Sequence, residues 1–257
     1  GLFVYEGEPL LERPWNMAVP ELGKTACEKE IARGLPRRMR TFTIYLPLYA
    51  PLARLEIGLD AGAAIAPPPP CRLDRPLPVY GTSITQGGCA STSGGDFVSV
   101  LGRRLNLDVI NLGFSGNGRG EPEMARLIAE IDAAAFVLDY CANTSVEGLD
   151  TTLPVFIDIL REKHPATPII CISKIHFYCE HISAAARKAA EAQRDVLIRH
   201  YSARRAAGDA NIHFIDGWSL VGAGEDLAFV DGVHPTSQGF ALMAERLVLP
   251  LRHVLEL

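Results

Sequence analysis

The chain of 257 residues is long enough for one large domain, or for a domain with a small appendage, and it can bury a sizeable core. Its formal net charge of −5 argues against partners such as nucleic acids or anionic membranes. The sequence has no run of about 18 apolar residues, so no membrane-spanning segment is predicted.

The six cysteines lack the paired close spacing of a zinc site, and a chain of this size needs no disulfide framework. Cys141 and Cys171 fall in predicted strands, where small buried thiols are usual. Cysteine usage favours a reducing compartment, and no basic stretch with an apolar core follows Gly1 as in a signal peptide. We therefore expect a soluble protein, with the cytoplasm as the favoured compartment and with neither a metal nor an organic cofactor.

Residues 1–72 are predicted to form a small β-rich domain. The segments 40–47 and 53–59 alternate apolar residues with β-branched and aromatic ones, and turn residues lie between the two segments. This texture is typical of antiparallel strands, and no periodic segment of helix length interrupts it. Residues 66–70 (APPPP) read as a stiff, extended linker, so a second domain is expected over 73–257.

Strands and helices alternate after the linker. The predicted strands are short and apolar: 77–82, 108–113, 135–141, 168–174 and 211–216. The predicted helices are amphipathic: 96–105, 121–132, 151–164, 182–206 and 236–254. This order indicates a five-stranded parallel sheet covered on both faces, which is a three-layer α/β/α sandwich of the flavodoxin-like kind.

Polar side chains that suit acyl transfer follow several of these strands. Ser83 lies in a glycine-flanked loop after the first strand, and Asp231 and His234 lie in one turn before the last helix. The loops at the carboxyl ends of parallel strands gather at one edge of the sheet. A neutral imidazole, with a reference pKa of about 6.5, can take the proton of a serine hydroxyl near pH 7. A carboxylate on its other nitrogen fixes the tautomer, so a Ser83–His234–Asp231 triad is predicted.

An oxyanion hole is predicted at the same edge. The backbone N–H groups of Ser83 and Gly116 and the side-chain amide of Asn143 would supply three donors. Losing one such donor typically slows the reaction by roughly a hundred- to thousandfold.

Four sequence blocks, in order over roughly residues 75–255, resemble those of the SGNH or GDSL hydrolases. Gly81-Thr82-Ser83 is similar to the family's first block, Gly-Asp-Ser, and Gly116 matches the glycine of the second. Cys141-Ala142-Asn143-Thr144 stands at the third block, Gly-x-Asn-Asp, and Asp231-Gly232-Val233-His234 matches the fifth, Asp-x-x-His. The resemblance implies that Ser83 is the nucleophile, His234 the base and Asp231 its orienting partner. Thr82, Cys141 and Thr144 depart from the family's usual supporting residues.

Within that family the chain resembles the branch with an N-terminal β-sandwich, and residues 43–62 look like the end of such a domain. The first half of that partial, jelly-roll-like domain is not found. The resemblance implies a serine esterase that acts on a small acyl ester of a carbohydrate or another hydroxylated small molecule. An acyltransferase that passes the acyl group from Ser83 to an alcohol stays open, as does a non-catalytic carbohydrate-binding protein.

Other motifs favour no different chemistry. The glycines of residues 113–120 do not follow the order G-x-G-x-x-G, and no Gly-Lys-Ser/Thr is present, which disfavours nucleotide binding. Residues 81–85 lack the second glycine of G-x-S-x-G, so an α/β-hydrolase elbow is disfavoured. His176, Tyr178 and Trp218 are candidates for substrate contacts, with ordinary packing as the alternative. The oligomeric state is left open.

Overall fold

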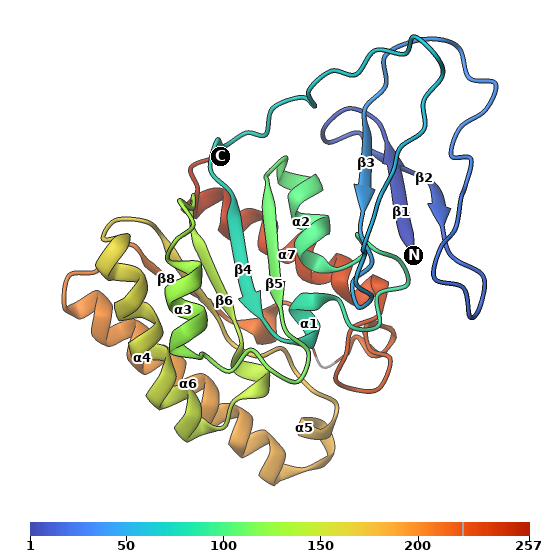
Figure 1. The fold of residues 1–257 in the computed structure, drawn as a ribbon. Helices are drawn as coiled ribbons and strands as arrows, with labels where there is room; N and C mark the ends of the chain where they lie inside the picture. Colours follow the sequence, from blue (N-terminus) through green and yellow to red (C-terminus); the bar gives the residue numbers. More distant parts are fainter. Residues whose placement is uncertain (223) are drawn as a thin grey trace.

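The larger of two sheets is made of five parallel strands in the order β5-β4-β6-β7-β8 (Figure 1), in a computed structural model that describes residues 1–222 and 224–257. Each strand is short and begins and ends within the range predicted for it. The strands are β4 (Leu77–Gly81), β5 (Val109–Gly113), β6 (Phe136–Asp139), β7 (Ile169–Ile172) and β8 (Ile212–Ile215).

Helices cover both faces of this sheet, which confirms the three-layer α/β/α sandwich. On one face lie α2 (Phe97–Leu105) and α7 (Ser237–Val254), and on the other α3 (Pro122–Ile128), α4 (Val146–Lys163) and α6 (Ala184–Ala206) (Figure 1). Successive strand residues alternate between the two cores. Val79 packs into the cluster that includes α2 and α7, and Tyr80 into the cluster that includes α3, α4 and α6. Both faces are thus apolar, as a covered parallel sheet requires.

Several helix boundaries differ from the predicted ones, in two cases where a serine side chain caps the helix. Helix α4 begins at Val146 rather than at 151, because Ser145 accepts a hydrogen bond from the backbone N–H of Gly148 (3.0 Å). The predicted helix 182–206 is divided at Ser183, which ends the short α5 (Cys179–Ile182) and caps α6. Helix α3 stops at Ile128, four residues before its predicted end.

The smaller sheet is antiparallel and has the order β2-β1-β3, with β1 (Leu2–Glu6), β2 (Arg13–Ala18) and β3 (Phe42–Tyr45). Strand β3 lies within the predicted strand 40–47. The predicted strand 53–59 is wrong, because that segment has no secondary structure and the side chains of Leu55, Ile57 and Leu59 are exposed. Its alternating pattern has no neighbouring strand to pair with, and a strand is stable only within a ladder.

Two buried thiols lie in the larger sheet and its margin. Cys141 and Cys171 are almost fully buried, as their predicted strand positions indicated. Burial raises the pKa of both thiols far above the usual range of cysteine. They therefore act as small apolar groups of the core. None of the described helices is both long enough and apolar enough to cross a membrane.

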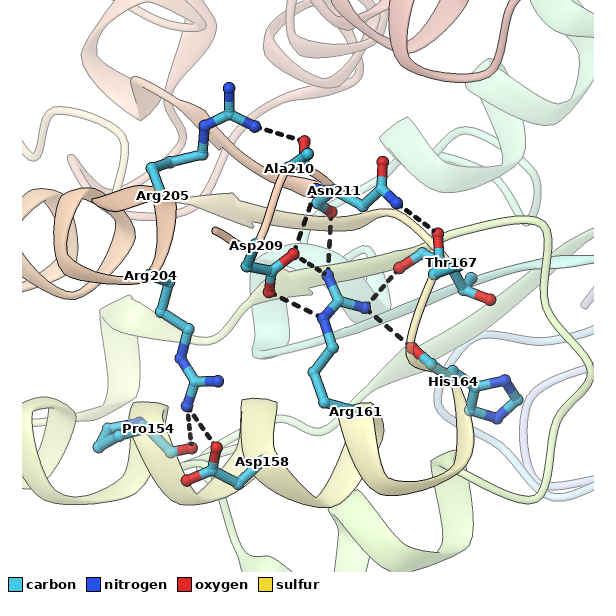
Figure 2. Close-up of polar contacts among 11 residues, drawn as sticks. Pro154, Asp158, Arg161, His164, Thr167, Arg204, Arg205, Asp209, Ala210 and Asn211 are labelled. Atoms are coloured by element: carbon cyan, nitrogen blue, oxygen red, sulfur yellow. Dashed lines mark hydrogen bonds and ion pairs between the residues drawn. The ribbon is translucent and has the colours of Figure 1, made fainter. Parts of the chain in front are cut away.

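An arginine network fixes the loops that enter β7 and β8, at the edge opposite the carboxyl ends of the strands. Figure 2 shows Arg161 of α4 paired through two nitrogens with the carboxylate of Asp209 (2.8 and 3.0 Å). The same guanidinium donates to the backbone carbonyls of His164 (3.0 Å), Thr167 (2.6 Å) and Asn211 (3.1 Å). Such a bidentate ion pair with added carbonyl acceptors holds these loops in one arrangement.

Candidate active site

Ser83 lies at the carboxyl end of β4 and is the first residue of the four-residue helix α1 (Ser83–Gln86). Strand β4 pairs with β5 on one side and with β6 on the other, so the direction in which successive strands are added to the sheet reverses at β4. Side chains at such a switch point project into the crevice beyond the sheet. Ser83 is partly exposed there, although the residues on either side of it are buried.

A hydrogen-bonded chain of threonines fixes the turn that carries Ser83. The Thr82 side chain accepts from the backbone N–H of Ile84 (3.2 Å), and the backbone N–H of Thr82 donates to Oγ1 of Thr85 (3.1 Å). Thr85 Oγ1 in turn donates to the buried carboxyl of Asp139, at the end of β6 (2.8 Å). This is a capping box built from two threonines. It shows how Thr82 serves where the family usually has an aspartate.

His234 and Asp231 come from one turn before α7. His234 Nε2 lies 3.0 Å from Ser83 Oγ, and His234 Nδ1 lies 2.8 Å from Asp231 Oδ2. The other Asp231 oxygen accepts from the backbone N–H groups of Val233 (3.0 Å) and His234 (2.8 Å), which fixes the carboxylate in the turn. With the Nδ1 proton held by Asp231, Nε2 is free to accept the hydroxyl proton of Ser83.

The surroundings keep Asp231 ionised although about half of its side chain is exposed. Hydrogen bonds from the His234 backbone and imidazole lower the pKa of Asp231 to about 2. A carboxylate that stays charged can stabilise the imidazolium that forms when His234 takes a proton.

The loop after β5 brings Gly116 to the same edge. Gly116 is exposed and has a φ of +71°, and a Cβ placed on it would meet nothing within 4 Å. The Asn143 amide donates to the backbone carbonyl of Asn117, so this side chain is tied to the Gly116 loop. Gln86 also holds the loop, because its side-chain oxygen accepts from the backbone N–H of Ser115 (2.8 Å). One amide hydrogen of Asn143 is left for another acceptor.

The three candidate substrate contacts lie together beside the Asp231–His234 turn. The His176 ring stacks on Trp218 (centroids 4.3 Å apart) and pairs with the buried Glu180 (3.1 Å). The backbone N–H of Tyr178 donates to the carbonyl of Gly232 (2.8 Å). Within the described part of the chain, no hydrogen bond or ring contact joins His176 or Trp218 to Ser83 or His234. Of the three, Tyr178 is the one that the described contacts join to this turn, and a substrate contact by any of them stays a prediction.

Four residues near Ser83 were not singled out from the sequence: Tyr49, Thr85, Gln86 and Asp139. A carboxylate ending an apolar strand, as in AFVLD, is the signal that could have found Asp139. Nothing local marks the other three, because their partners are distant in the chain. Over the described residues, no group of three or more His, Cys, Asp or Glu side chains is arranged to hold a metal ion.

Comparison with known proteins agrees with this architecture. Residues 74–252 match the GDSL-like Lipase/Acylhydrolase family. A solved structure from Bacteroides ovatus, described as a GDSL-like lipase, is 31% identical, with a TM-score of 0.90 over 99% of this chain and 74% of that chain. The fold therefore places the protein among the SGNH/GDSL hydrolases. More narrowly, the chain belongs to the GDSL-like lipase/acylhydrolase family, whose enzymes are of the esterase type.

More distant structures share the fold alone. The salicylyl-acyltransferase SsfX3 from a tetracycline biosynthetic pathway is 24% identical, with a TM-score of 0.63 over 71% of this chain and 56% of that chain. A family two carbohydrate esterase from Clostridium thermocellum is 18% identical, with a TM-score of 0.59 over 75% of this chain and 67% of that chain. Among curated proteins, none matches the chain.

Proposed function

We propose that the protein is a serine esterase that removes a small acyl group from a carbohydrate or another hydroxylated small molecule. The observation that supports this most directly is the unbroken chain of hydrogen bonds from Ser83 through His234 to Asp231. The substrate class is proposed by analogy with a family two carbohydrate esterase that has the same fold. The acyltransferase SsfX3 also shares this fold, and it likewise handles an acyl group.

In the proposed reaction, Ser83 Oγ attacks the ester carbonyl carbon while its proton passes to His234 Nε2. The oxyanion is held by the backbone N–H groups of Ser83 and Gly116 and by the second amide hydrogen of Asn143. The imidazolium then gives its proton to the leaving alcohol oxygen, and the acyl group stays on Ser83. Water, deprotonated by the same imidazole, releases the acid and restores the hydroxyl.

The test is hydrolysis of p-nitrophenyl acetate, butyrate and octanoate by the wild type, Ser83→Ala and the matched control Ser202→Ala. Ser202 is exposed on α6, so its loss is expected to change nothing. We expect Ser83→Ala to lower kcat/KM at least about a thousandfold, and the wild type to prefer the acetate. Asp231→Asn is expected to lower kcat by about two to four orders of magnitude, because the imidazole loses its orienting charge.

Ser83→Ala with the wild-type rate would refute the site. Failure of a fluorophosphonate probe to label Ser83 would favour a non-catalytic binding protein. If the wild type labels yet cleaves none of the three esters, transfer to an alcohol becomes the better account. Added acceptor alcohol would then divert the acyl group from water, which product analysis measures directly.

A further inference from the structure

A segment of the N-terminal part lies directly against the loop that follows the nucleophile. The Gln86 side-chain nitrogen donates to the backbone carbonyl of Leu48 (3.0 Å), and the Leu48 methyl lies 3.0 Å from where a Cβ on Gly87 would be. Gln86 thus binds Leu48 with its nitrogen and Ser115, next to Gly116, with its oxygen. The Gln86 side chain therefore connects the N-terminal part, helix α1 and the loop that carries Gly116.

Tyr49, the next residue in this segment, reaches the immediate neighbourhood of the base. A Cβ placed on Gly88 would lie 2.8 Å from the Tyr49 hydroxyl, 3.1 Å from the Ser83 carbonyl and 3.4 Å from His234 Cδ2. The hydroxyl and the imidazole edge therefore face the same small space, which only a glycine at position 88 leaves open. Tyr49 is 53% exposed, and within the described residues no hydrogen bond occupies its hydroxyl.

A cavity of about 300 Å³ adjoins Tyr49 between the small sheet and the loop 87–93. Apolar residues of the N-terminal part line one side of it, among them Phe3, Met17 and Leu48, and the polar residues Ser91, Thr92 and Ser93 line the other. None of the described residues around it carries a charged side chain. Such a lining suits a neutral molecule that has both carbon surface and hydroxyl groups.

Because Tyr49 lies beside His234, the proton transfers of the reaction indicate which half of an ester would occupy the adjoining cavity. The imidazole must give its proton to the leaving alcohol oxygen, so that alcohol lies beside the imidazole. We propose that Tyr49 and the adjoining cavity bind the alcohol half of the substrate, with the Tyr49 hydroxyl bonded to a hydroxyl of that alcohol. This inference rests on the proposed esterase function and makes the N-terminal part a determinant of specificity.

The test compares two acetate esters, methyl 6-O-acetylglucoside and ethyl acetate. Both give the same acetyl-enzyme, so a difference between them arises on the alcohol side alone. We expect Tyr49→Phe to lower kcat/KM for the sugar acetate by about 3- to 10-fold, which is the loss of one neutral hydrogen bond. For ethyl acetate we expect a change of less than about twofold. Tyr5→Phe makes the same chemical change in the small sheet, away from this cavity, and is expected to alter neither ester.

Equal losses on the two esters, or none on the sugar acetate, would overturn the role of Tyr49. A wild type that handles ethyl acetate as well as the sugar acetate would overturn the alcohol site as a whole. Ser83→Ala is measured in the same series. If it keeps the wild-type rate, the proposed esterase function fails; if it is inactive while Tyr49→Phe shows no selectivity, only the present inference fails.

Discussion

Asp139 is a buried carboxyl group that takes no part in the proposed reaction. It accepts its hydrogen bond from Thr85, and burial raises its pKa to about 7. In the unfolded chain an aspartate titrates near pH 3.9, roughly three units lower. The folded protein therefore holds one more proton between about pH 4 and pH 7, and its free energy of unfolding falls as the pH rises through that window.

Asp139→Asn should remove this dependence, because it keeps an acceptor for Thr85 and loses the ionisable group. Relative to the wild type, its free energy of unfolding is expected to rise by about 1–4 kcal/mol between pH 4.5 and pH 7.5. Urea unfolding at the two values measures this. Asp231→Asn is the control, since the low pKa of Asp231 leaves it charged in both states over this window. An identical shift in both variants would contradict the assignment.

Among individual residues, sequence analysis could identify those that lie in a short, recognisable stretch of the chain. Asp231 and His234 are three positions apart, and Ser83 follows a strand between glycines, so both could be read from the chain. Tyr49 and Gln86 could not, because each matters through a neighbour that only the folded chain supplies. The roles assigned to the triad stay predictions until activity is measured.

Two glycines of the loop after β5 have the same backbone conformation but different surroundings, so substituting each one tests a different reason for needing glycine. Gly116 and Gly118 both have positive φ, +71° and +68°. A Cβ on Gly116 meets nothing within 4 Å, whereas one on Gly118 would lie 2.1 Å from the carbonyl oxygen of Gly81, just before the turn that carries Ser83. The first glycine is needed for its conformation alone, and the second also for the close approach of two chain segments.

Gly116→Ala is therefore expected to cost about 1–2 kcal/mol of unfolding free energy, the penalty for a left-handed residue. Gly118→Ala is expected to cost at least about 3 kcal/mol, because the backbone of the loop or of Gly81 must move. Thermal and urea unfolding of the pair give the comparison, and each variant serves as the other's control. Equal losses of unfolding free energy in the two variants would mean that the loop shifts at position 118 without a further energetic penalty.

The elements that could be predicted are those with buried faces. Strands such as β6 and β7 are continuous apolar runs, FVLD and IICI, and their helices are amphipathic. Strand β2 was missed because most of its side chains are exposed, so its sequence, RPWNMA, has no apolar alternation. Helix ends were displaced where a single serine caps the backbone, as Ser145 does for α4.

For the molecule as a whole, we propose that residues 1–72 and 73–257 are separate domains and that Arg103 is one of the side chains that hold them together. The Arg103 guanidinium, on α2, lies over the rings of Tyr5 (4.3 Å) and Tyr45 (4.9 Å) and donates to the carbonyl of Gly94 (2.8 Å). Cation–π contacts of a partly desolvated arginine stabilise by about 1–2 kcal/mol each.

Arg103→Ala is expected to let the small sheet detach while the larger domain stays folded. Limited proteolysis should then cut within 46–72 faster than in the wild type, and a low-temperature unfolding transition should appear in calorimetry. Arg104→Ala is the matched control, because Arg104 is exposed and its ion pair among the described residues is a surface contact with Glu245. A single transition, as cooperative as in the wild type, would argue against two domains.

The hydrogen bond between Ser83 and His234 joins residues that are 151 positions apart. A ribosome makes the serine long before the histidine, and a domain generally folds as a unit once it has been synthesised. Strands β4, β5 and β6 are all made before the turn that holds His234 exists. The serine of a nascent chain is thus an ordinary alcohol, and reactivity arrives only with the last strand and helix. A covalent probe of Ser83 would therefore report the completion of folding as well as catalysis.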